Sequence, residues 1–153
     1  MWTVRSRRRL QVEVSAPPDA VRTFYCDLHN MTKVHPLVVS VRCTEQRSTA
    51  DGDYHDYRIE DRIPMGPVAM TVRYRASVLV TPDGVAHTEA RQFPAVRLSG
   101  TVTFDPSAGG TTITECIDIA APRPLAAYTV RQATAAHATL LERIADYFGK
   151  NPA

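Results

Sequence analysis

The chain has 153 residues, of which 44% are hydrophobic, 22% charged and 7% aromatic, a composition typical of a folded domain rather than a disordered or fibrous chain. Lys and Arg number 18 against 16 Asp and Glu, so the net charge is only +2. A nucleic-acid partner is not expected, because the one basic cluster, at residues 5–9, has no stacking aromatics interleaved with it. We interpret this cluster as the solvated start of a strand rather than an anion-binding arm.

The three cysteines are far apart and show no Cys-x-x-Cys spacing, so neither a disulfide framework nor a metal site or other cofactor is expected. No apolar run approaches the ~20 residues needed to cross a bilayer. The Arg-rich start leads into a strand-like pattern rather than the apolar segment of a signal peptide. We therefore expect a reduced, cytoplasmic protein without stable membrane insertion, present as a monomer or homodimer and folded as a single domain over residues 1–153.

The first predicted elements are a strand and two helices. Apolar residues alternate over residues 10–14, which predicts a strand, and residues 15–19 combine a serine, two prolines and an acid, which favours a helix start. Residues 21–28 then carry apolar side chains at helical spacing. A second, short helix over residues 30–34 is expected to end before Pro36, because a residue that precedes proline disfavours the helical conformation.

The middle of the chain predicts a continuous run of strands. Turn signals rich in Gly, Pro and Asp recur between residues 37 and 120 at a spacing too short for helices. Consecutive strands joined by such short turns form an antiparallel meander. The six predicted strands cover residues 38–47, 54–63, 68–80, 86–93, 96–104 and 111–119.

The last predicted element is a long helix. After residues 122–124, Pro-Arg-Pro, neither proline nor glycine occurs before Gly149, which predicts a helix of about 24 residues ending at Phe148. Its predicted apolar stripe, which must pack against one face of the meander, contains Val130, Thr134, His137, Leu141, Ile144 and Phe148, with Ala127 and Ala133 beside it. We therefore expect an α+β fold in which a curved, antiparallel, seven-stranded sheet grips one long C-terminal helix, with room for a pocket between them.

This order of elements resembles the START-like helix-grip superfamily, also called SRPBCC, which includes polyketide cyclase/dehydrase-like proteins and the birch-pollen allergen family. The resemblance covers nearly the whole chain. Its most specific segments are residues 12–21 and residues 30–37, Asn-Met-Thr-Lys-Val-His-Pro-Leu, where Val34 stands at a position that is often aromatic in the family. The resemblance implies a hydrophobic tunnel that holds lipids, sterols, polyketides or aromatic hormones. It assigns no reaction, because this fold serves many activities.

Alternation along each strand predicts which side chains face the interior, because successive side chains of a strand point to opposite faces. For residues 86–93 the inward set stays open, since Thr88 and Ala90 compete with Glu89 and Arg91. In the strand at residues 38–47, the predicted inward set is Val39, Val41 and Cys43. The predicted ligand-binding residues combine inward-facing strand residues with His35 at the end of the second helix and with residues of the apolar stripe on the C-terminal helix. They are His35, His55, Tyr57, Ile59, Asp61, Met70, Val72, Tyr74, Val102, Phe104, Glu115, Thr134, His137 and Leu141.

Three of these residues, His55, Asp61 and Glu115, are titratable groups on otherwise apolar faces. A buried polar group without a partner costs ~1–3 kcal/mol, so each needs a hydrogen-bond partner. They either surround a pocket, where they are the candidate catalytic residues, or pair with an arginine or a backbone group at the rim of the sheet. For two histidines the alternative to lining the pocket is a structural role: His137 as a hydrogen-bonded core residue and His35 as a helix cap. Tyr57 and Tyr74 suit core packing as well as ligand contact.

The sequence supports two main hypotheses for the function. The first is binding of a small hydrophobic or aromatic ligand, such as a lipid, polyketide or sterol-like molecule, in a cavity between sheet and C-terminal helix. The alternative is a polyketide aromatase/cyclase or dehydratase that uses inward His, Asp, Glu and Tyr groups, although no nucleophile motif is present. His55 and Asp61 lie ~20 Å apart along one strand, so an acid–base partner must come from another strand. A third hypothesis is a docking module with exposed arginines, which predicts a filled interior.

Overall fold

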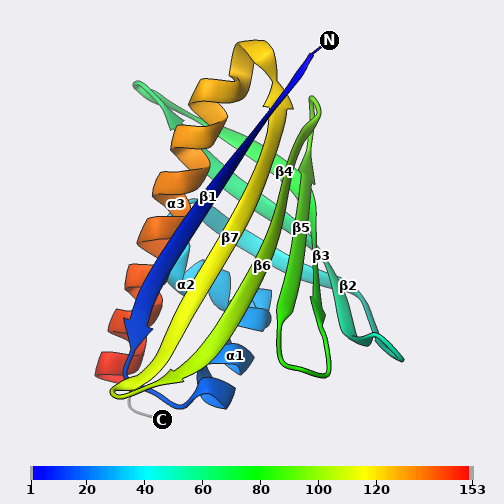
Figure 1. Ribbon diagram of the computed structural model, residues 1–153. Coiled ribbons are helices and arrows are strands. Elements are labelled where there is room, and N and C mark those ends of the chain that lie inside the picture. Colours follow the sequence, from blue (N-terminus) through cyan, green and yellow to red (C-terminus); the bar gives the residue numbers. More distant parts are fainter. Residues whose placement is uncertain (1, 152–153) are drawn as a thin grey trace.

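The computed structural model describes residues 2–151, which form a strongly bent sheet with one long helix beside it (Figure 1). All neighbouring strands are antiparallel. In chain order the elements are β1 (Thr3–Val14), α1 (Pro18–Cys26), the 3-10 helix η1 (Leu28–Asn30), α2 (Met31–Val34), β2 (Val38–Thr49), β3 (Gly52–Met65), β4 (Val68–Val80), β5 (Ala86–Gln92), β6 (Val96–Ser107), β7 (Gly110–Pro122) and α3 (Arg123–Lys150).

The sheet has seven strands in the order β1-β7-β6-β5-β4-β3-β2. Strands β2 to β7 form the predicted meander, and β1 adds to its end by pairing with β7. Helix α3 runs along β1 and β7, while the short helices lie at the lower end of the sheet, where α1 packs against β6 and α2 against β2 (Figure 1). The predicted seven-stranded helix-grip fold is therefore confirmed.

The short helices form where the sequence favours them, and a proline ends the last of them. Helix α1 begins with Pro18 in its first turn, where the missing amide proton costs nothing, and Asp19 follows as an acid near the positive helix end. It buries Val21 and its neighbouring aromatic residues on one face. Helix α2 ends before His35, which is extended because it precedes Pro36.

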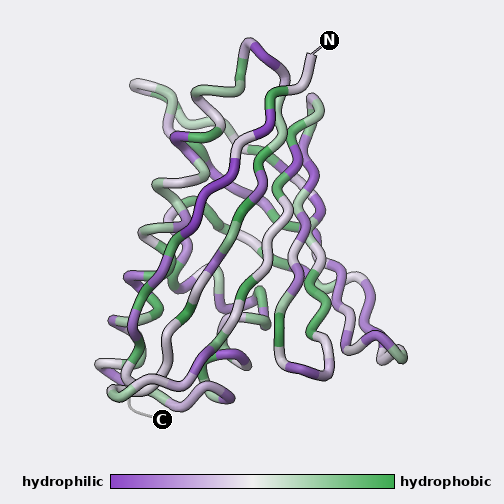
Figure 2. The backbone as a smooth tube through the Cα atoms, in the orientation of Figure 1, coloured by the Kyte–Doolittle hydropathy of each residue, from purple (hydrophilic) through white to green (hydrophobic). Residues whose placement is uncertain are grey.

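The core lies at the closed end of the fold, where the C-terminal half of α3 meets the sheet and α1. Ile113 of β7 and Ile144 of α3 are both 0% exposed. Phe24 of α1 lies edge-on to Phe148 of α3, with ring centroids 5.4 Å apart. Hydrophobic and hydrophilic residues alternate along the strands (Figure 2), so one face of each strand supplies this core. Packing at this end is continuous from β1 to α3.

Helix α3 is longer than predicted and its buried face is partly different. It spans 28 residues, and Ala127, predicted beside the apolar stripe, is exposed. Four of its six buried residues follow His137, where the helix is packed into the main core, whereas Ala126 packs in a small separate cluster with Val96 and Ala121. The N-terminal half faces a cavity instead. Within residues 2–151, no helix is long and apolar enough to cross a membrane.

The structure decides which side chains face the interior in two strands, β2 and β5. The prediction for Val39 is wrong: it is 45% exposed, because an irregularity in the β2–β3 register between Val38 and Ser40 reverses the alternation, so that Val38 is buried instead. In β5, Thr88 and Ala90 face the interior. Their partners in the sheet register, Val78 and Ala76, are buried.

We predict that Ile144→Ala lowers the free energy of unfolding by about 2–5 kcal/mol, because the substitution leaves a cavity in the packed half of the core. Urea denaturation measures the change. Val68→Ala is the control, since Val68 is 67% exposed and its truncation is expected to stay within about 0.5 kcal/mol. Equal losses for the two variants would contradict the described packing of α3.

Candidate functional site

A cavity of about 510 Å³ lies between the sheet, the N-terminal half of α3 and the segment from η1 to the start of β2. Most of its wall is hydrophobic. Strand residues such as Ile59, Leu98 and Ile117 line it from the sheet, and Ala133 and Leu140 line it from α3. The part of α3 that lines the cavity combines small side chains, Thr129, Ala133 and Ala136, with larger ones such as Tyr128.

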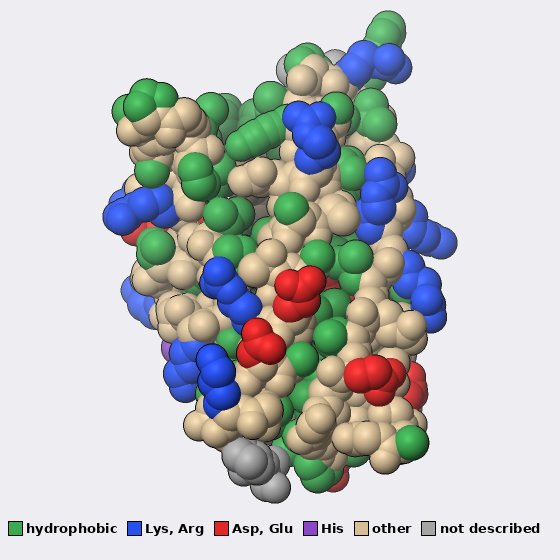
Figure 3. All heavy atoms as spheres, turned by 90° about the vertical axis from the view of Figure 1, so that its left-hand side faces the viewer, with side chains coloured by type: hydrophobic (Ala, Val, Ile, Leu, Met, Phe, Trp, Pro, Cys, Tyr) green, Lys and Arg blue, Asp and Glu red, His purple; other side chains and the backbone are tan. Residues whose placement is uncertain are grey.

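The mouth of the cavity is surrounded by exposed apolar side chains. Met65 and Met70, on either side of the β3–β4 turn, are 47% and 46% exposed, Phe93 of the β5–β6 turn is 91% exposed, and Leu125 of α3 is 40% exposed. All four also line the cavity. These turns and the start of α3 lie at the same end of the molecule (Figure 1), where hydrophobic side chains gather on the surface (Figure 3). A contiguous exposed apolar patch of this kind commonly marks a ligand entrance or a binding surface.

A buried ion pair forms the floor of the cavity. Glu115 of β7 is 1% exposed, and its carboxylate accepts a hydrogen bond from the Tyr25 hydroxyl and contacts Nδ1 of His137. Burial by itself raises the pKa of Glu115, but the charge and hydrogen bond of His137 outweigh burial and lower it. Burial likewise lowers the pKa of His137, and the Glu115 charge and hydrogen bond reverse that effect, so the net shift is upward. Both net shifts favour the charged form, so each partner stabilises the charge of the other.

His35 lies beside this pair as a second, uncharged imidazole. The backbone N–H of Leu37 donates to its Nδ1 at 3.2 Å, which places the ring proton on Nε2. Burial, followed by the positive charge of His137, lowers the pKa of His35 to about 3. The ring centroids of His35 and His137 are 5.9 Å apart. The floor thus holds two imidazoles side by side, one whose surroundings favour the charged form and one whose surroundings favour the neutral form.

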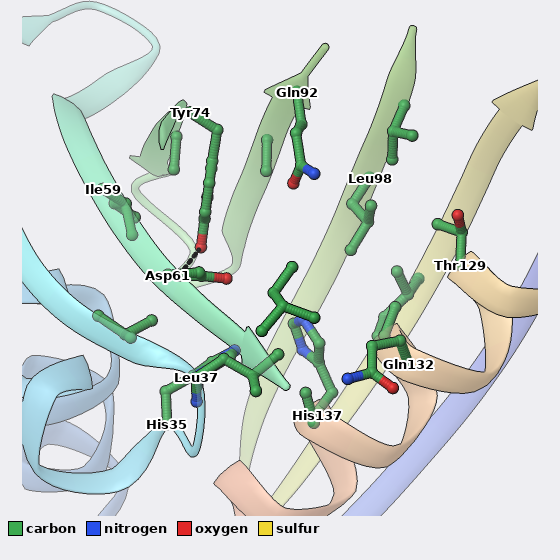
Figure 4. A pocket seen from close by; sticks show the side chains of 18 of the residues that line it. His35, Leu37, Ile59, Asp61, Tyr74, Gln92, Leu98, Thr129, Gln132 and His137 are labelled. Carbon is green, nitrogen blue, oxygen red and sulfur yellow. Dashed lines mark hydrogen bonds between the residues drawn. The ribbon is translucent and has the colours of Figure 1, made fainter. Parts of the chain in front are cut away.

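Asp61 and Tyr74 form a second polar pair on the wall made by β3 and β4. The Tyr74 hydroxyl donates to Oδ1 of Asp61 at 3.1 Å. Burial raises the pKa of Asp61 to about 6, although the hydrogen bond from Tyr74 opposes this shift. Figure 4 shows the Asp61 carboxylate pointing into the cavity from β3 and the His137 ring pointing into it from α3. A carboxylate and an imidazolium therefore face the same space from different elements.

The structure brings half of the predicted ligand-binding residues to the wall of this cavity. These seven residues are His35, Ile59, Asp61, Met70, Tyr74, Glu115 and His137. The other seven lie outside the described lining: His55, Tyr57, Val72, Val102, Phe104, Thr134 and Leu141.

Four of the seven residues outside the lining, His55, Tyr57, Val102 and Phe104, share inward faces with lining residues but lie at other heights along their strands. Val72 lies between the lining residues Met70 and Tyr74 on β4, and Thr134 and Leu141 adjoin lining residues on α3. Val102, Phe104 and Leu141 are buried in the solid core at the closed end. Tyr57 is covered by His29 of η1, with ring centroids 5.7 Å apart, and His55 stacks on Tyr57. Asp61 is therefore the one predicted polar residue on the inward face of β3 that lines the cavity. Glu115, another candidate catalytic residue, lines it from β7.

Sequence reasoning missed several polar groups of the site. Gln92 continues the inward face of β5, whose alternation was ambiguous in the sequence. Thr129 and Gln132 lie on the face of α3 next to the predicted stripe, where they alternate with alanines. Tyr25 was predicted only as an apolar helix position, and the general need of a buried tyrosine hydroxyl for a partner was the available signal. Among the described residues, no group of three or more His, Cys, Asp or Glu side chains is arranged to hold a metal ion.

Comparison with known proteins places the chain in a family. A family model described as polyketide cyclase / dehydrase and lipid transport matches residues 1–149. The chain belongs to this family. A search of curated proteins gave no significant match.

Solved structures confirm the fold of this member of the polyketide cyclase / dehydrase and lipid transport family. The protein TTHA0849 from Thermus thermophilus is 18% identical, each chain covers 99% of the other, and the TM-score is 0.72. The Zhui aromatase/cyclase from Streptomyces sp. R1128 is 14% identical over 95% of this chain and 93% of its own, with a TM-score of 0.69. A STAR-related lipid transfer protein from Xanthomonas axonopodis is 18% identical over 92% and 84%, with a TM-score of 0.61. At these identities the likeness shows the fold alone.

The low pKa of His35 predicts a pH dependence of stability. The pKa is about 3 in the folded protein and about 6.5 in an unfolded chain, so between these values only the unfolded state binds the proton and stability rises with pH. We expect His35→Gln to reduce this slope by up to about 1.4 kcal/mol per pH unit. Denaturation at a series of pH values measures it, with the exposed His87→Gln as the matched control. An unchanged slope would mean that His35 is protonated in the folded protein.

Proposed function

We propose that this protein binds a small, largely apolar molecule in the cavity between the sheet and α3. The observation that carries this proposal is the cavity itself, about 510 Å³ in volume and lined chiefly by hydrophobic side chains, with a few polar groups at defined places. Ligand sites in proteins commonly have this size and character. Membership in a family described by polyketide cyclase / dehydrase activity and lipid transport supports the same class of ligand.

The physical driving force of such binding is burial of hydrocarbon. Each buried CH₂ group contributes ~0.8 kcal/mol, and association costs about 4–15 kcal/mol in lost motion. Roughly ten buried carbons therefore contribute about 8 kcal/mol, which exceeds the lower part of this range, and about twenty contribute about 16 kcal/mol, which exceeds all of it, provided that the polar atoms of the ligand find partners. Asp61, Tyr74 and His137 supply such partners inside the cavity. A docking module without a ligand required a filled interior, and the cavity argues against it.

We predict that filling the cavity abolishes binding without unfolding the protein. Ala133 lines the cavity on α3, whereas Ala135, two residues later, is exposed. Ala133→Phe is expected to eliminate the rise in melting temperature that a bound apolar ligand produces, and Ala135→Phe is expected to retain it. A panel of lipids and aromatic polyketide analogues, screened by thermal denaturation, provides the measurement. At 100 times its dissociation constant a ligand adds about 2.7 kcal/mol of stability. Loss of binding in both variants, or in neither, would count against this site.

A second candidate function is acid–base catalysis on the bound ligand, and the convergence of Asp61 and His137 favours it. At neutral pH, Asp61 with a pKa of about 6 is mostly ionised and can accept a proton, while the raised pKa of His137 favours the protonated ring, which can donate one. Dehydration of a β-hydroxy ketone needs one general base and one general acid. The base removes the proton next to the carbonyl, and the acid protonates the departing hydroxyl, which leaves as water. Glu115 acts on His137 as a positioning residue in this scheme.

We predict that Asp61→Asn and His137→Gln each lower the kcat of such a dehydration by about 10²–10⁴-fold, the usual contribution of one acid or base. Asp56→Asn is the control, because Asp56 lies on the same strand and pairs with Arg75 at 3.3 Å outside the cavity. Activity of the native protein should rise through about pH 6 as Asp61 ionises. Water loss from a β-hydroxy ketone, followed by absorbance of the enone product, measures the rate. Full turnover by both cavity variants would remove the catalytic hypothesis and leave binding intact.

A further inference from the structure

We propose that the cavity selects uncharged molecules that carry ketone or hydroxyl groups and discriminates against carboxylates of the same size. This inference rests on the proposed binding function and narrows it to a class of ligand. It starts from the charges around the cavity. Among the described residues that line it there is no lysine or arginine. A ligand carboxylate therefore finds no free side-chain cation with a fixed charge in this wall.

Two carboxylates of the cavity wall, Glu89 and Asp61, differ in whether a cationic side chain neutralises their charge. Glu89 is neutralised by Arg91 at 2.7 Å and Arg97 at 3.0 Å. Asp61, in contrast, is bonded to the neutral hydroxyl of Tyr74, and no ion pair joins it to another described residue within 4 Å. A second carboxylate in the cavity would face the Asp61 charge in a region of low water content, where like charges repel strongly.

The histidines offset this repulsion only in part, because the His137 charge that attracts Asp61 is shared with Glu115. The Glu115 carboxylate already contacts Nδ1 of His137, so even a protonated His137 forms a pair with Glu115 that has no net charge. His35 is held neutral, since its Nδ1 accepts the Leu37 N–H. An anion bound beside His137 would share one positive charge with Glu115 and approach that buried carboxylate as well. The floor of the cavity is thus suited to a polar but uncharged group.

Neutral hydrogen-bonding groups are available along the rest of the cavity. Figure 4 shows Gln92 on β5 and Thr129 and Gln132 on α3 with their polar ends in the cavity. An amide or a hydroxyl offers both a donor and an acceptor, so it satisfies a ketone oxygen as readily as a hydroxyl. With the imidazoles at the floor, these groups form separated polar positions in a hydrocarbon wall. That spacing fits a hydrocarbon frame with several uncharged oxygens.

The test compares three probes of one chain length: dodecanoic acid, 1-dodecanol and 2-dodecanone. Each displaces the uncharged fluorescent dye Nile red from the full chain at pH 8, where the acid is ionised, and the Ala133→Phe variant establishes that the displaced dye reports the cavity. We expect the alcohol and the ketone to compete at about ten-fold or more lower concentration than the carboxylate, because the latter faces like charge. In Asp61→Asn, dodecanoate should compete at a concentration closer to that of the neutral probes, so the ratio of the competing concentrations should decrease. Asp56→Asn should leave this ratio unchanged.

Each outcome decides the inference. Competition by dodecanoate equal to or stronger than that of the neutral probes overturns the proposed selectivity and leaves the binding function in place. An unchanged ratio in Asp61→Asn overturns the assignment of the discrimination to that carboxylate. If none of the three probes displaces the dye from a site that Ala133→Phe blocks, the inference fails together with the proposed class of ligand. If the dye itself does not bind in the cavity, the proposed binding function fails as well.

Discussion

The contact of Glu115 with His137 and Tyr25 is the interaction on which the site depends. It joins β7, α3 and α1 at a single buried point. Three polar groups satisfy one another there, which makes burial of the charges tolerable, whereas removal of one partner leaves an uncompensated charge in the interior. The contact also fixes the position of α3 on the sheet. It therefore sets the boundary between the packed end of the molecule and the hollow end.

The same strands serve both ends of the molecule. In β6, Val102 is buried in the core, while Leu98, on the same face, lines the cavity. In β7 the corresponding pair is Ile113 and Ile117, with Glu115 between them. Helix α3 repeats this division, because most of its packed residues lie after His137 and most of its residues that border the cavity lie before it, while Leu140 does both. A bent sheet and a straight helix remain in full contact only over part of their length, and the division follows from that geometry.

The polar groups of the cavity are held by neighbours rather than by solvent. Tyr74 supports Asp61 across one strand pair, and the Leu37 N–H holds the His35 ring in one tautomer. Exposed apolar side chains at the mouth, such as Phe93, are costly for a protein that needs no apolar partner, and they fit an entrance for a hydrophobic molecule. The proposed binding, the proposed selectivity and the candidate acid–base chemistry therefore all rest on one arrangement of preorganised polar groups in a hydrocarbon wall.

Local sequence patterns by themselves determined the elements and most of their inward faces. The period of two in the strands and of about three and a half in the helices is a property of neighbouring residues, so the meander, the long helix and the inward position of Asp61 and Glu115 were readable from the chain. Tertiary structure alone decided which part of each face borders the cavity. His55 and Asp61 share a face of β3, yet only Asp61 reaches the cavity, because α3 and η1 cover the sheet at different heights. The meeting of His35 with His137, about a hundred residues later in the chain, likewise depends on how the helix is seated against the bent sheet, and no local pattern records that distance.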